Sequence, residues 1–473
     1  LNVIKDNEID MIKSVLIANR GEIAIRIART ARRMGIKTYV VRTAKEPEAV
    51  YLSAADAVIN FPETDGNIPE FLDIDRLVGL AREYKIDSLH PGYGYLSENA
   101  ELAERCRDNG IVFIGPSPEV IRLMGDKVAA KGIAAQSGVP MLGASQGAVH
   151  TLDEARKIAK RLGYPVIIKA VSGGGGRGMR IVHHQDELEQ LYKIATAEAQ
   201  VAFNDPSVFI EKYLENPKHI EFQIVADNYG NVVHLGEREC SIQRKHQKLM
   251  EEAPSPALDE RLRKKMAAAA VSLAKQAGYQ SLGTVEFLLD HQKHFYFMEM
   301  NTRIQVEHGV TELVTGVDLV RQQLRIASGL ALRLRQEDVT LQGHAIECRI
   351  NAEDPVQGFR PCPGRVDFLH FPGGPGVRVD SCLYSGGELS PYYDSMAAKI
   401  LAYAPTRMET IRRMRRCLEE FTLEGFPTNA ELSYQILYHP EFILGECTTA
   451  FLDEHLSELL EFSRKLSESG VDA

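Results

Sequence analysis

The sequence predicts an α/β protein that ends in an α+β region. Buried strands alternate with helices from Ser14 onward, in the order VLIA, a helix over 22–34, KTYVV, ADAVIN, DSLH and VFIG. Such alternation is typical of a parallel sheet. A chain of 473 residues that is 44% hydrophobic can bury several cores, so two to four domains are expected.

Composition and charge narrow the class of protein. The net charge of -10 and the pI near 5.8 argue against a nucleic-acid surface, and no apolar run approaches transmembrane length. The segment before Met11 has no signal-peptide core, so Met11 resembles a natural start and residues 1–10 an upstream leader. Seven cysteines without a C-x-x-C pair indicate reduced thiols. We therefore expect a cytoplasmic protein with no nucleic-acid or membrane partner.

The N-terminal segment predicts a Rossmann-like sheet over 11–125 that does not bind NAD. The turn at 19–22, Asn-Arg-Gly-Glu, joins strand to helix with one glycine, so the dinucleotide fingerprint is absent. HPGYGYLSE at 90–98 follows a strand, at the edge where such sheets bind ligands. A purely structural turn explains this motif equally well.

Three other segments give weaker signals. The connector 118–140 is helix-rich and carries Lys127, and we expect Gly132 to interrupt its helix. AIECRINAED, from 345, predicts a strand that carries Arg349, and the Gly/Pro-rich passage after it suits loops and short strands. The polar tail after Leu456 is expected to fray.

A glycine-rich hairpin is predicted near residue 175. Gly173, Gly175 and Gly178 fit G-x-G-x-x-G, but the residues that follow, 179–184, have the pattern of a strand and not of a helix. The glycines therefore form a hairpin tip, whose backbone N–H groups can close over phosphate oxygens while Lys169 adds charge. A flexible linker is the alternative.

The main chemical signal is the stretch VEFLLDHQKHFYFMEMNTRIQVEH at 285–308. Two short apolar runs joined by a turn at 291–294 predict a hairpin with Glu286 opposite Glu299. These carboxylates, with the amide of Asn301, offer hard oxygen ligands for Mg²⁺. Continued period-2 spacing places one polar set on the same side: Glu299, Asn301, Arg303, Gln305 and Glu307. The alternative is a solvated strand face.

A basic segment precedes this hairpin. Its cationic side chains are Arg238, Arg244, Lys245, His246 and Lys248. A surface charge run is the ordinary explanation. Because the following helix, 258–278, leads directly into the carboxylate hairpin, these groups are also candidates to bind phosphate or a small carboxylate near the metal.

Taken in order, the motifs resemble biotin carboxylase over residues 11–455. They are ANRGEIA, HPGYGYLSENA, FIGPS, MGDK, SGGGGRGM, EKYLENPKHIE, HLGERECSIQRKHQK, EEAPSP, FMEMNTRIQVEH and GHAIECRINAEDP. This resemblance implies an ATP-grasp enzyme with a Rossmann-like domain at 11–125, an ATP-grasp domain at 126–333 with a lid at about 141–213, and a C-terminal domain at 344–455. A leader (1–10) and a tail (456–473) flank them.

The resemblance also implies site residues. ATP would be bound by Lys127, Lys169, Gly173, Gly174, Gly175, Gly176, Gly178, Met179, Glu211, Lys212, Leu214, His219, Gln243 and His246. Two Mg²⁺ or Mn²⁺ ions would be held by Glu286, Glu299 and Asn301. Bicarbonate and biotin would be bound by Lys248, Arg303, Gln305, Val306, Glu307, Arg349 and Tyr93. Glu307 would be the base for bicarbonate, and Arg349 would stabilise the biotin enolate.

The function implied is ATP- and bicarbonate-dependent carboxylation of biotin on a separate carrier protein, through carboxyphosphate. Because the attachment motif Met-Lys-Met is absent and no carboxyltransferase domain follows, the partners would be the biotin carboxyl carrier protein and carboxyltransferase subunits. The resemblance also implies a homodimer. The acceptor, such as acetyl-CoA, another acyl-CoA or pyruvate, stays open. The alternatives are another ATP-grasp ligase and a non-catalytic nucleotide-binding subunit.

Two departures from the family pattern stand out. Gly309 follows His308 where proline is usual, which is expected to loosen the bicarbonate loop. Residues 45–50 depart from the usual acidic residues after the second strand, so the role of that loop is open.

Overall fold

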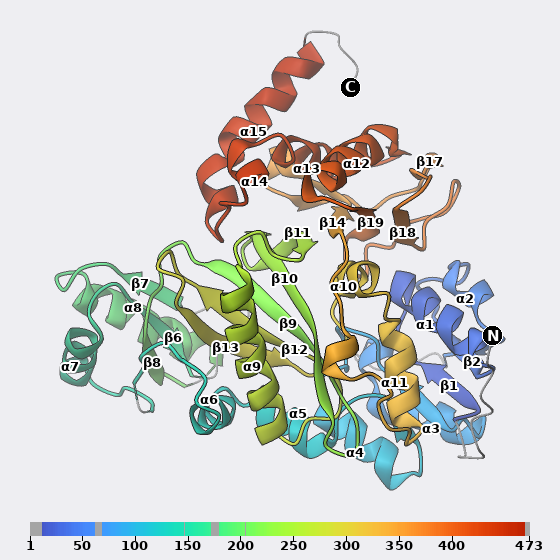
Figure 1. The fold of residues 1–473 in the computed structure, drawn as a ribbon, viewed down its shortest axis with the longest axis horizontal. Helices are drawn as coiled ribbons and strands as arrows, with labels where there is room; N and C mark the ends of the chain where they lie inside the picture. The colour runs from blue at the N-terminus through green and yellow to red at the C-terminus, as the bar shows by residue number, and fades with distance from the viewer. Residues whose placement is uncertain (1–11, 62–68, 146, 172–178, 204, 469–473) are drawn as a thin grey trace.

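The computed structural model describes residues 12–61, 69–145, 147–171, 179–203 and 205–468, without the side chains of 202–203 and 462–468. The expected leader and the tip of the expected glycine hairpin lie outside these ranges. Figure 1 shows a central sheet with an N-terminal unit, a lid and a C-terminal unit around it. Within the described ranges, no helix has both the length and the apolar character needed to span a membrane.

The N-terminal unit is the predicted Rossmann-like sheet. Its strands pair in parallel in the order β3-β2-β1-β4-β5. Its elements are β1 (Ser14–Ile17), α1 (Gly21–Arg33), β2 (Lys37–Arg42), α2 (Tyr51–Ala54), β3 (Ala57–Asn60), α3 (Ile74–Glu83), β4 (Ser88–His90), α4 (Ala100–Asp108) and β5 (Val112–Phe113). The order reverses between β1 and β4, and ligands bind parallel sheets at such a point.

The loops after β1 and β4 are tied together at this point. Asn19 donates from Nδ2 to the carbonyls of Pro91 and Tyr93, both at 2.8 Å. Gly92 has φ +67, and a Cβ there would lie 2.7 Å from Asn19 Nδ2, so glycine is required. The loop at 90–98 is thus held against the sheet and directed toward the rest of the molecule.

The connector forms two helices, α5 (Pro118–Gly125) and α6 (Lys127–Gln136). The expectation that Gly132 interrupts a helix is wrong, because Gly132 lies inside α6. The break falls at Asp126, whose carboxylate accepts from the N–H groups of Val128 and Ala129. A side-chain cap of this kind starts a new helix more strongly than one interior glycine ends one.

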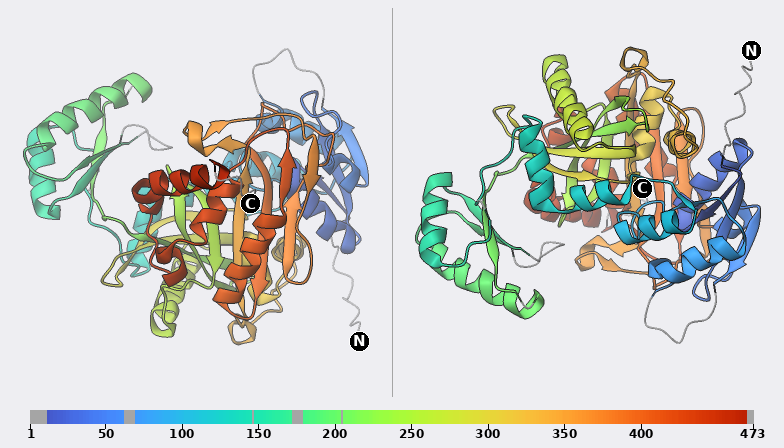
Figure 2. Two further views of the ribbon diagram at one scale, coloured as in Figure 1. Left: turned by 90° about the horizontal axis from the view of Figure 1, so that it is seen from above. Right: turned by 90° about the horizontal axis from the view of Figure 1, so that it is seen from below.

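The lid is a separate antiparallel unit. Its strands pair in the order β7-β6-β8, with α7 (Leu152–Leu162) and α8 (Leu188–Phe203) packed on them. The strands are β6 (Val166–Ala170), β7 (Met179–Val182) and β8 (Val208–Lys212). Because β6 and β7 flank residues 172–178 and pair antiparallel, the predicted hairpin is confirmed up to its tip. Both views of Figure 2 show the lid at one side of the molecule and the N-terminal unit at the other.

The central sheet has eight strands in the order β13-β12-β9-β10-β11-β14-β19-β18, each paired antiparallel with its neighbour. The strands are β9 (Lys218–Ala226), β10 (Val232–Arg244), β11 (Gln247–Ala253), β12 (Ser281–Leu289), β13 (Phe295–Asn301), β14 (His344–Asn351), β18 (Val377–Ser381) and β19 (Met396–Ala404). Pairing of β11 with β14 makes one continuous sheet from two distant segments of the chain.

Helices cover this sheet where its side chains are apolar. Strand β9 alternates Ile220, Phe222 and Ile224 with polar residues, and these apolar side chains pack in one core with α9 (Glu260–Gln276). The polar residues of β9 therefore lie on the opposite face. Helices α10 (His308–Thr315) and α11 (Leu319–Ala327) connect the sheet to the N-terminal unit.

The C-terminal unit packs helices on β14 and β19. They are α12 (Arg407–Glu420), α13 (Ala430–Ile436), α14 (Pro440–Leu444) and α15 (Phe451–Glu468); the short strands are β15 (Glu353–Asp354), β16 (Arg360–Pro361), β17 (Phe368–His370) and β20 (Thr422–Glu424). The expectation of a frayed tail after Leu456 is wrong up to Glu468, because α15 continues to that residue. Leu456 and Leu459 pack into the core and anchor the helix.

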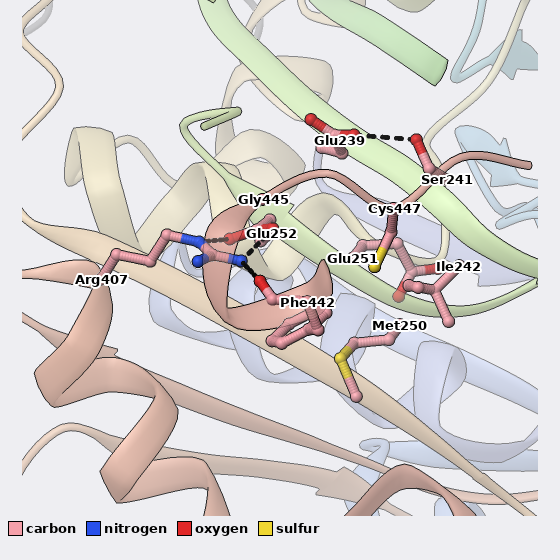
Figure 3. Close-up of a pocket in the computed structure, with 10 residues that line it drawn as sticks. All are labelled: Glu239, Ser241, Ile242, Met250, Glu251, Glu252, Arg407, Phe442, Gly445 and Cys447. Atoms are coloured by element: carbon pink, nitrogen blue, oxygen red, sulfur yellow. Dashed lines mark hydrogen bonds and ion pairs between the residues drawn. The ribbon is translucent and has the colours of Figure 1, made fainter. Parts of the chain in front are cut away.

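A buried ion pair attaches the C-terminal helices to the sheet. Glu252 on β11 accepts from Arg407 Nε at 2.6 Å and lies 2.7 Å from His344 Nε2. Figure 3 shows the guanidinium of Arg407 reaching from α12 to Glu252 and to the backbone at Phe442, at one side of a small pocket. Although burial acts in the opposite direction, the hydrogen bond from His344 and the charge of Arg407 lower the pKa of Glu252 from 4.5 to about 2.

This lowered pKa predicts acid sensitivity. The ionised Glu252 contributes stability that is complete above the unfolded pKa and is lost as the pH falls from 4.5 toward about 2. In thermal melts at decreasing pH, Glu252→Gln should lose less melting temperature than the wild type over this window. Glu446→Gln, which changes an exposed carboxylate just after α14, should lose melting temperature as the wild type does. Parallel losses in wild type and Glu252→Gln would contradict the assignment.

Candidate active site

The carboxylate hairpin is formed as predicted. Glu286 on β12 and Glu299 on β13 are register partners, and Asn301 is the last residue of β13. Asn301 Nδ2 donates to Glu286 Oε1 at 2.8 Å. Part of the Glu299 side chain is exposed to solvent. Its pKa is nevertheless raised, first because neighbouring protein atoms partly remove the carboxylate from water and then because the carboxylates of Glu286 and Glu98 repel its charge. A divalent cation would relieve this repulsion, so the oxygen donors fit Mg²⁺.

The prediction that the extended strand continues beyond Asn301 is wrong, because β13 ends at Asn301 and the chain turns into α10, which begins at His308. The polar side chains still converge. Arg303 donates to Asn301 Oδ1 at 3.1 Å and to Gln305 Oε1 at 2.7 Å, and Gln305 Nε2 lies 3.1 Å from Glu286 Oε1. Irregular backbone thus brings together groups that the sequence pattern had assigned to one strand face.

Lys248 is the centre of a buried charge cluster. Its ammonium group donates to Glu307 at 2.6 Å, to Glu221 at 2.6 Å and to Glu286 at 3.1 Å. The surface-run interpretation of the basic segment is therefore wrong for Lys248 and for the fully buried Arg238, whereas Lys245 and His246 are exposed. One cation shared by three carboxylates can stay buried because it offers three donors.

Glu307 lies between two cations. Its other carboxylate oxygen accepts from Arg349 Nη2 at 3.0 Å, and the same guanidinium nitrogen lies 2.5 Å from Glu251. Burial alone would raise the pKa of Glu307, but Lys248 and Arg349 hold it well below the ordinary value. Burial and the nearby carboxylate of Glu307 raise the pKa of Glu251 to about 7, although Arg349 and Lys248 act in the opposite direction. Glu307 is therefore ionised, buried and fixed on both oxygens.

Several members of the cluster were not predicted from the sequence. Glu221 is fully buried and accepts from Arg238 Nε at 2.5 Å, while Arg238 also donates to Gln223 and Thr311. The alternation of β9 was the available signal, since after Lys218 the polar residues His219, Glu221 and Gln223 alternate with the apolar residues of the strand. His219 Nε2 lies 3.0 Å from Glu286 Oε2, as part of the same face.

Cationic side chains also gather between the connector and the lid. Lys169 on β6 donates to Glu211 on β8 at 2.5 Å, and Lys131 on α6 contacts the same carboxylate. Burial and the neighbouring cations Lys131 and Lys127 lower the pKa of Lys169 to about 8. Lys131, which no sequence motif marked, follows Lys127 by one helical turn. An anion between these lysines would be favoured.

The remaining expected ATP residues lie on the lid and on the strands beside it. Met179 begins β7, Leu214 follows β8, and Lys212 donates to the carbonyls of Gly163 and Tyr164. Gln243 pairs with Lys248 in the β10–β11 register, and His246 is in the turn between these strands. The five glycines of the tip lie outside the described residues.

Tyr93 is joined to the site through a short chain of contacts. Its hydroxyl donates to Glu22, which lies 2.9 Å from Lys399 Nζ. Lys399 in turn donates to the carbonyl of Val306 at 2.8 Å. Gly309 lies in α10 and not in a loop, and a Cβ there would meet Leu401 at 2.4 Å, so this position is tightly packed. None of the candidate catalytic side chains lines the pocket of Figure 3.

A hairpin on a separate lid, beside a sheet with paired carboxylates and buried lysines, defines an ATP-grasp enzyme. Three family descriptions match the chain in succession. They are "Biotin carboxylase, N-terminal domain" over 11–121, "Carbamoyl-phosphate synthase L chain, ATP binding domain" over 126–335 and "Biotin carboxylase C-terminal domain" over 347–454.

Two similar proteins carry names that agree with these descriptions. The biotin carboxylase of Nostoc sp. (strain PCC 7120) is 53% identical over 93% of this chain and 98% of the relative. A pyruvate carboxylase subunit of Methanothermobacter thermautotrophicus is 48% identical over 94% and 90%. The chain belongs to the biotin carboxylase family, and its activity is the ATP-dependent carboxylation of biotin.

Solved structures share this fold closely. The biotin carboxylase domain dimer of Hydrogenobacter thermophilus 2-oxoglutarate carboxylase, in complex with MgADP, ADP and bicarbonate, has a TM-score of 0.88 at 47% identity and covers 94% of this chain and 98% of that one. The biotin carboxylase of Campylobacter jejuni has a TM-score of 0.89 at 44% identity, with coverages of 94% and 99%. The predicted fold class and family are thereby confirmed.

Removal of the central cation is a direct test of the cluster. Lys248→Met should raise the pKa of Glu307, so the acid side of the pH profile of bicarbonate-dependent ATP turnover should move to higher pH. It should also destabilise the fold by about 3–5 kcal/mol, because buried carboxylates lose their counter-charge. Lys248→Arg is the control that keeps the charge. An acid limb that stays in place in Lys248→Met would show that Lys248 does not set the ionisation of Glu307.

Proposed function

We propose that ATP binds between the lid and the central sheet. Lys169, Lys131 and His219 bind its phosphates, and the β8–β9 connection at 213–217 borders its base. Support comes from the position of Lys169 and Lys131, which reach the carboxylate of Glu211 from β6 and from α6. Burial and the neighbouring cations Lys131 and Lys127 lower the pKa of Lys169 to about 8. An anionic phosphate chain beside these lysines would add the negative charge that favours their protonated form. Lys127, one turn before Lys131 on α6, extends the same cationic surface.

Glu286, Glu299 and Asn301 hold the Mg²⁺ that accompanies the nucleotide. The cross-strand register of Glu286 and Glu299 supports this assignment, and burial together with repulsion from Glu286 raises the pKa of Glu299, which a bound cation would offset. When bound, the metal neutralises charge on the phosphate oxygens during transfer. The chain itself keeps the donors in register through the Asn301 hydrogen bond to Glu286.

Bicarbonate binds beside Glu307, on Lys248 and Arg303, and Glu307 accepts its proton. The resulting carbonate attacks the γ-phosphorus of ATP and gives carboxyphosphate and ADP. Carboxyphosphate breaks down to CO₂ and phosphate, phosphate removes the N–H proton of biotin, and the enolate attacks CO₂. Arg349 faces the oxygen that becomes negative in this enolate. Tyr93, Gln305 and Val306 complete the walls around biotin and bicarbonate.

One observation carries this assignment. Glu307 is buried and ionised, with Lys248 on one oxygen and Arg349 on the other. A general base must be unprotonated and held within reach of its proton. The same two cations can also bind the anionic reactants beside Glu307, Lys248 the bicarbonate and Arg349 the biotin enolate. An ATP-grasp ligase that forms another product needs the metal site and the lid but has no use for this pair.

Variants of this pair test the proposal. Glu307→Gln should lower bicarbonate-dependent ATP turnover by about 10²- to 10⁴-fold, because the base is lost, while ATP affinity changes little. Arg349→Ala should reduce biotin carboxylation far more than ATP affinity. Arg244→Ala removes a cation of the same sheet outside the cluster and is the matched control. Near wild-type carboxylation by Glu307→Gln, or equal losses of both properties in Arg349→Ala, would refute these roles.

We further propose that biotin arrives on a separate carrier protein and that the chain works in the cytoplasm as a homodimer with carboxyltransferase partners. The free thiols of all seven cysteines agree with a reducing compartment. Relatives include one subunit of a pyruvate carboxylase and one domain of a 2-oxoglutarate carboxylase, the latter solved as a dimer. These relatives favour an oxo acid as one candidate acceptor, beside acetyl-CoA and other acyl-CoAs.

The carrier proposal has its own test. The purified chain should carry no covalent biotin, hydrolyse ATP slowly with bicarbonate alone, and accelerate strongly when a biotinylated carrier is added, because a tether raises the effective biotin concentration. Intact mass and ADP release measure these properties, with the unbiotinylated carrier as control. A biotin-sized mass increment, or turnover indifferent to carrier, would contradict it.

A further inference from the structure

A second group of potential metal ligands lies on the C-terminal helices, outside the candidate active site. One nitrogen each of His439 and His455 and one carboxylate oxygen of Glu458 all lie within 4.8 Å of one another. His439 directly precedes α14, and His455 and Glu458 are one turn apart on α15. Residues three apart on a helix share a face, so α15 presents both groups together.

The two imidazole rings are held in place by packing. Their centroids are 4.4 Å apart, and both rings contact the fully buried Phe451, at 4.9 Å for His439 and 5.1 Å for His455. Aromatic contacts of this kind restrict ring rotation. Metal affinity increases when ligands are fixed before the metal binds.

The hydrogen bonds leave nitrogen lone pairs available. His455 Nε2 lies 3.0 Å from Glu441 Oε1, which favours the proton on Nε2, and Nδ1 then points toward Glu458 Oε2 at 3.8 Å. A carboxylate behind a histidine is the usual partner of a metal-bound imidazole. The contact from the Glu441 N–H to His439 Nδ1 is long, at 3.3 Å, and a metal there would replace a weak hydrogen bond.

We propose that His439, His455 and Glu458 bind a divalent transition metal of the zinc type, with Glu441 orienting His455. Two imidazoles and one carboxylate, with water as a fourth ligand, match the donor set that zinc prefers, whereas Mg²⁺ prefers oxygen. Tetrahedral ligands at about 2.0–2.1 Å from a metal lie about 3.3 Å apart. Small side-chain rotations from the present arrangement therefore close the site.

Such a metal would tie α15 to the start of α14. The segment between these helices contacts the nucleotide side of the molecule, since Lys218 on β9 donates to the carbonyls of Gly445 and Cys447, at 2.9 and 2.6 Å. The N–H of Thr449 donates to the carbonyl of Pro217 at 2.9 Å. The site is thus a structural clamp on the C-terminal helices and not part of the reaction.

The test uses the full chain after treatment with a chelator, titrated with Co²⁺ and with Zn²⁺ in the presence of excess Mg²⁺, which occupies the oxygen-donor site. Co²⁺ should bind near one equivalent and give the intense visible absorption of a tetrahedral complex, and Zn²⁺ should displace it and raise the melting temperature. His455→Ala should abolish the absorption. His291→Ala, which removes an exposed histidine of the β12–β13 turn, should leave it unchanged.

Glu458→Gln keeps the test decisive if His455→Ala fails to fold, because Glu458 is exposed on α15. Its Co²⁺ affinity should fall by at least about tenfold, while ATP turnover stays at the wild-type level. Octahedral Co²⁺ spectra, or equal affinities in wild type and Glu458→Gln, would overturn the proposal and leave an ion-pair and aromatic cluster only. Loss of carboxylation in the Glu307 variants would not affect this result.

Discussion

The site depends on the ion pairs that the buried ammonium group of Lys248 makes with three carboxylates. Glu221, Glu286 and Glu307 are almost completely removed from water, and each would be neutral if it were buried alone. Because one cation contacts all three, and Arg238 and Arg349 add charge behind them, the pKa of Glu307 falls where burial would raise it. The cluster thus keeps the buried carboxylate of Glu307, which we propose as the base, in its ionised form.

Such an arrangement requires a rigid support, because the desolvation of buried ions is offset only when their geometry is close to ideal. The central sheet supplies it. Lys248 lies on β11 and Arg349 on the neighbouring β14, although these strands come from different segments of the chain. Glu307, the residue directly before α10, contacts both cations. The irregular segment that leads to Glu307 is held by the hydrogen bonds of Arg303 and Gln305. The cluster therefore combines Lys248 and Glu307, from the segment that matches the ATP binding domain, with Arg349, from the segment that matches the biotin carboxylase C-terminal domain.

Local patterns allowed much of the fold to be predicted. The parallel strands of the N-terminal unit, the two antiparallel hairpins and the Glu286–Glu299 register all follow from short-range periodicity and turn residues. Predictions from residue propensity failed where a helix cap or a packing contact had a larger effect on the backbone than the propensity did. Gly132 is accommodated because Asp126 starts α6, and α15 extends to Glu468 because Leu456 and Leu459 pack in the core.

The sequence by itself determined the residue types of the site and their order along the chain, because hard oxygen ligands, lysines and a glycine-rich turn are recognisable without coordinates. Only the tertiary structure decided their charge states and partners. Arg349 and Glu251 are 98 positions apart and meet across paired strands, and Glu221, Arg238 and Lys131 join the site through contacts that no local pattern specifies. The physical reason is that periodicity reports which face a residue occupies, whereas the energy of a buried charge depends on every group that surrounds it.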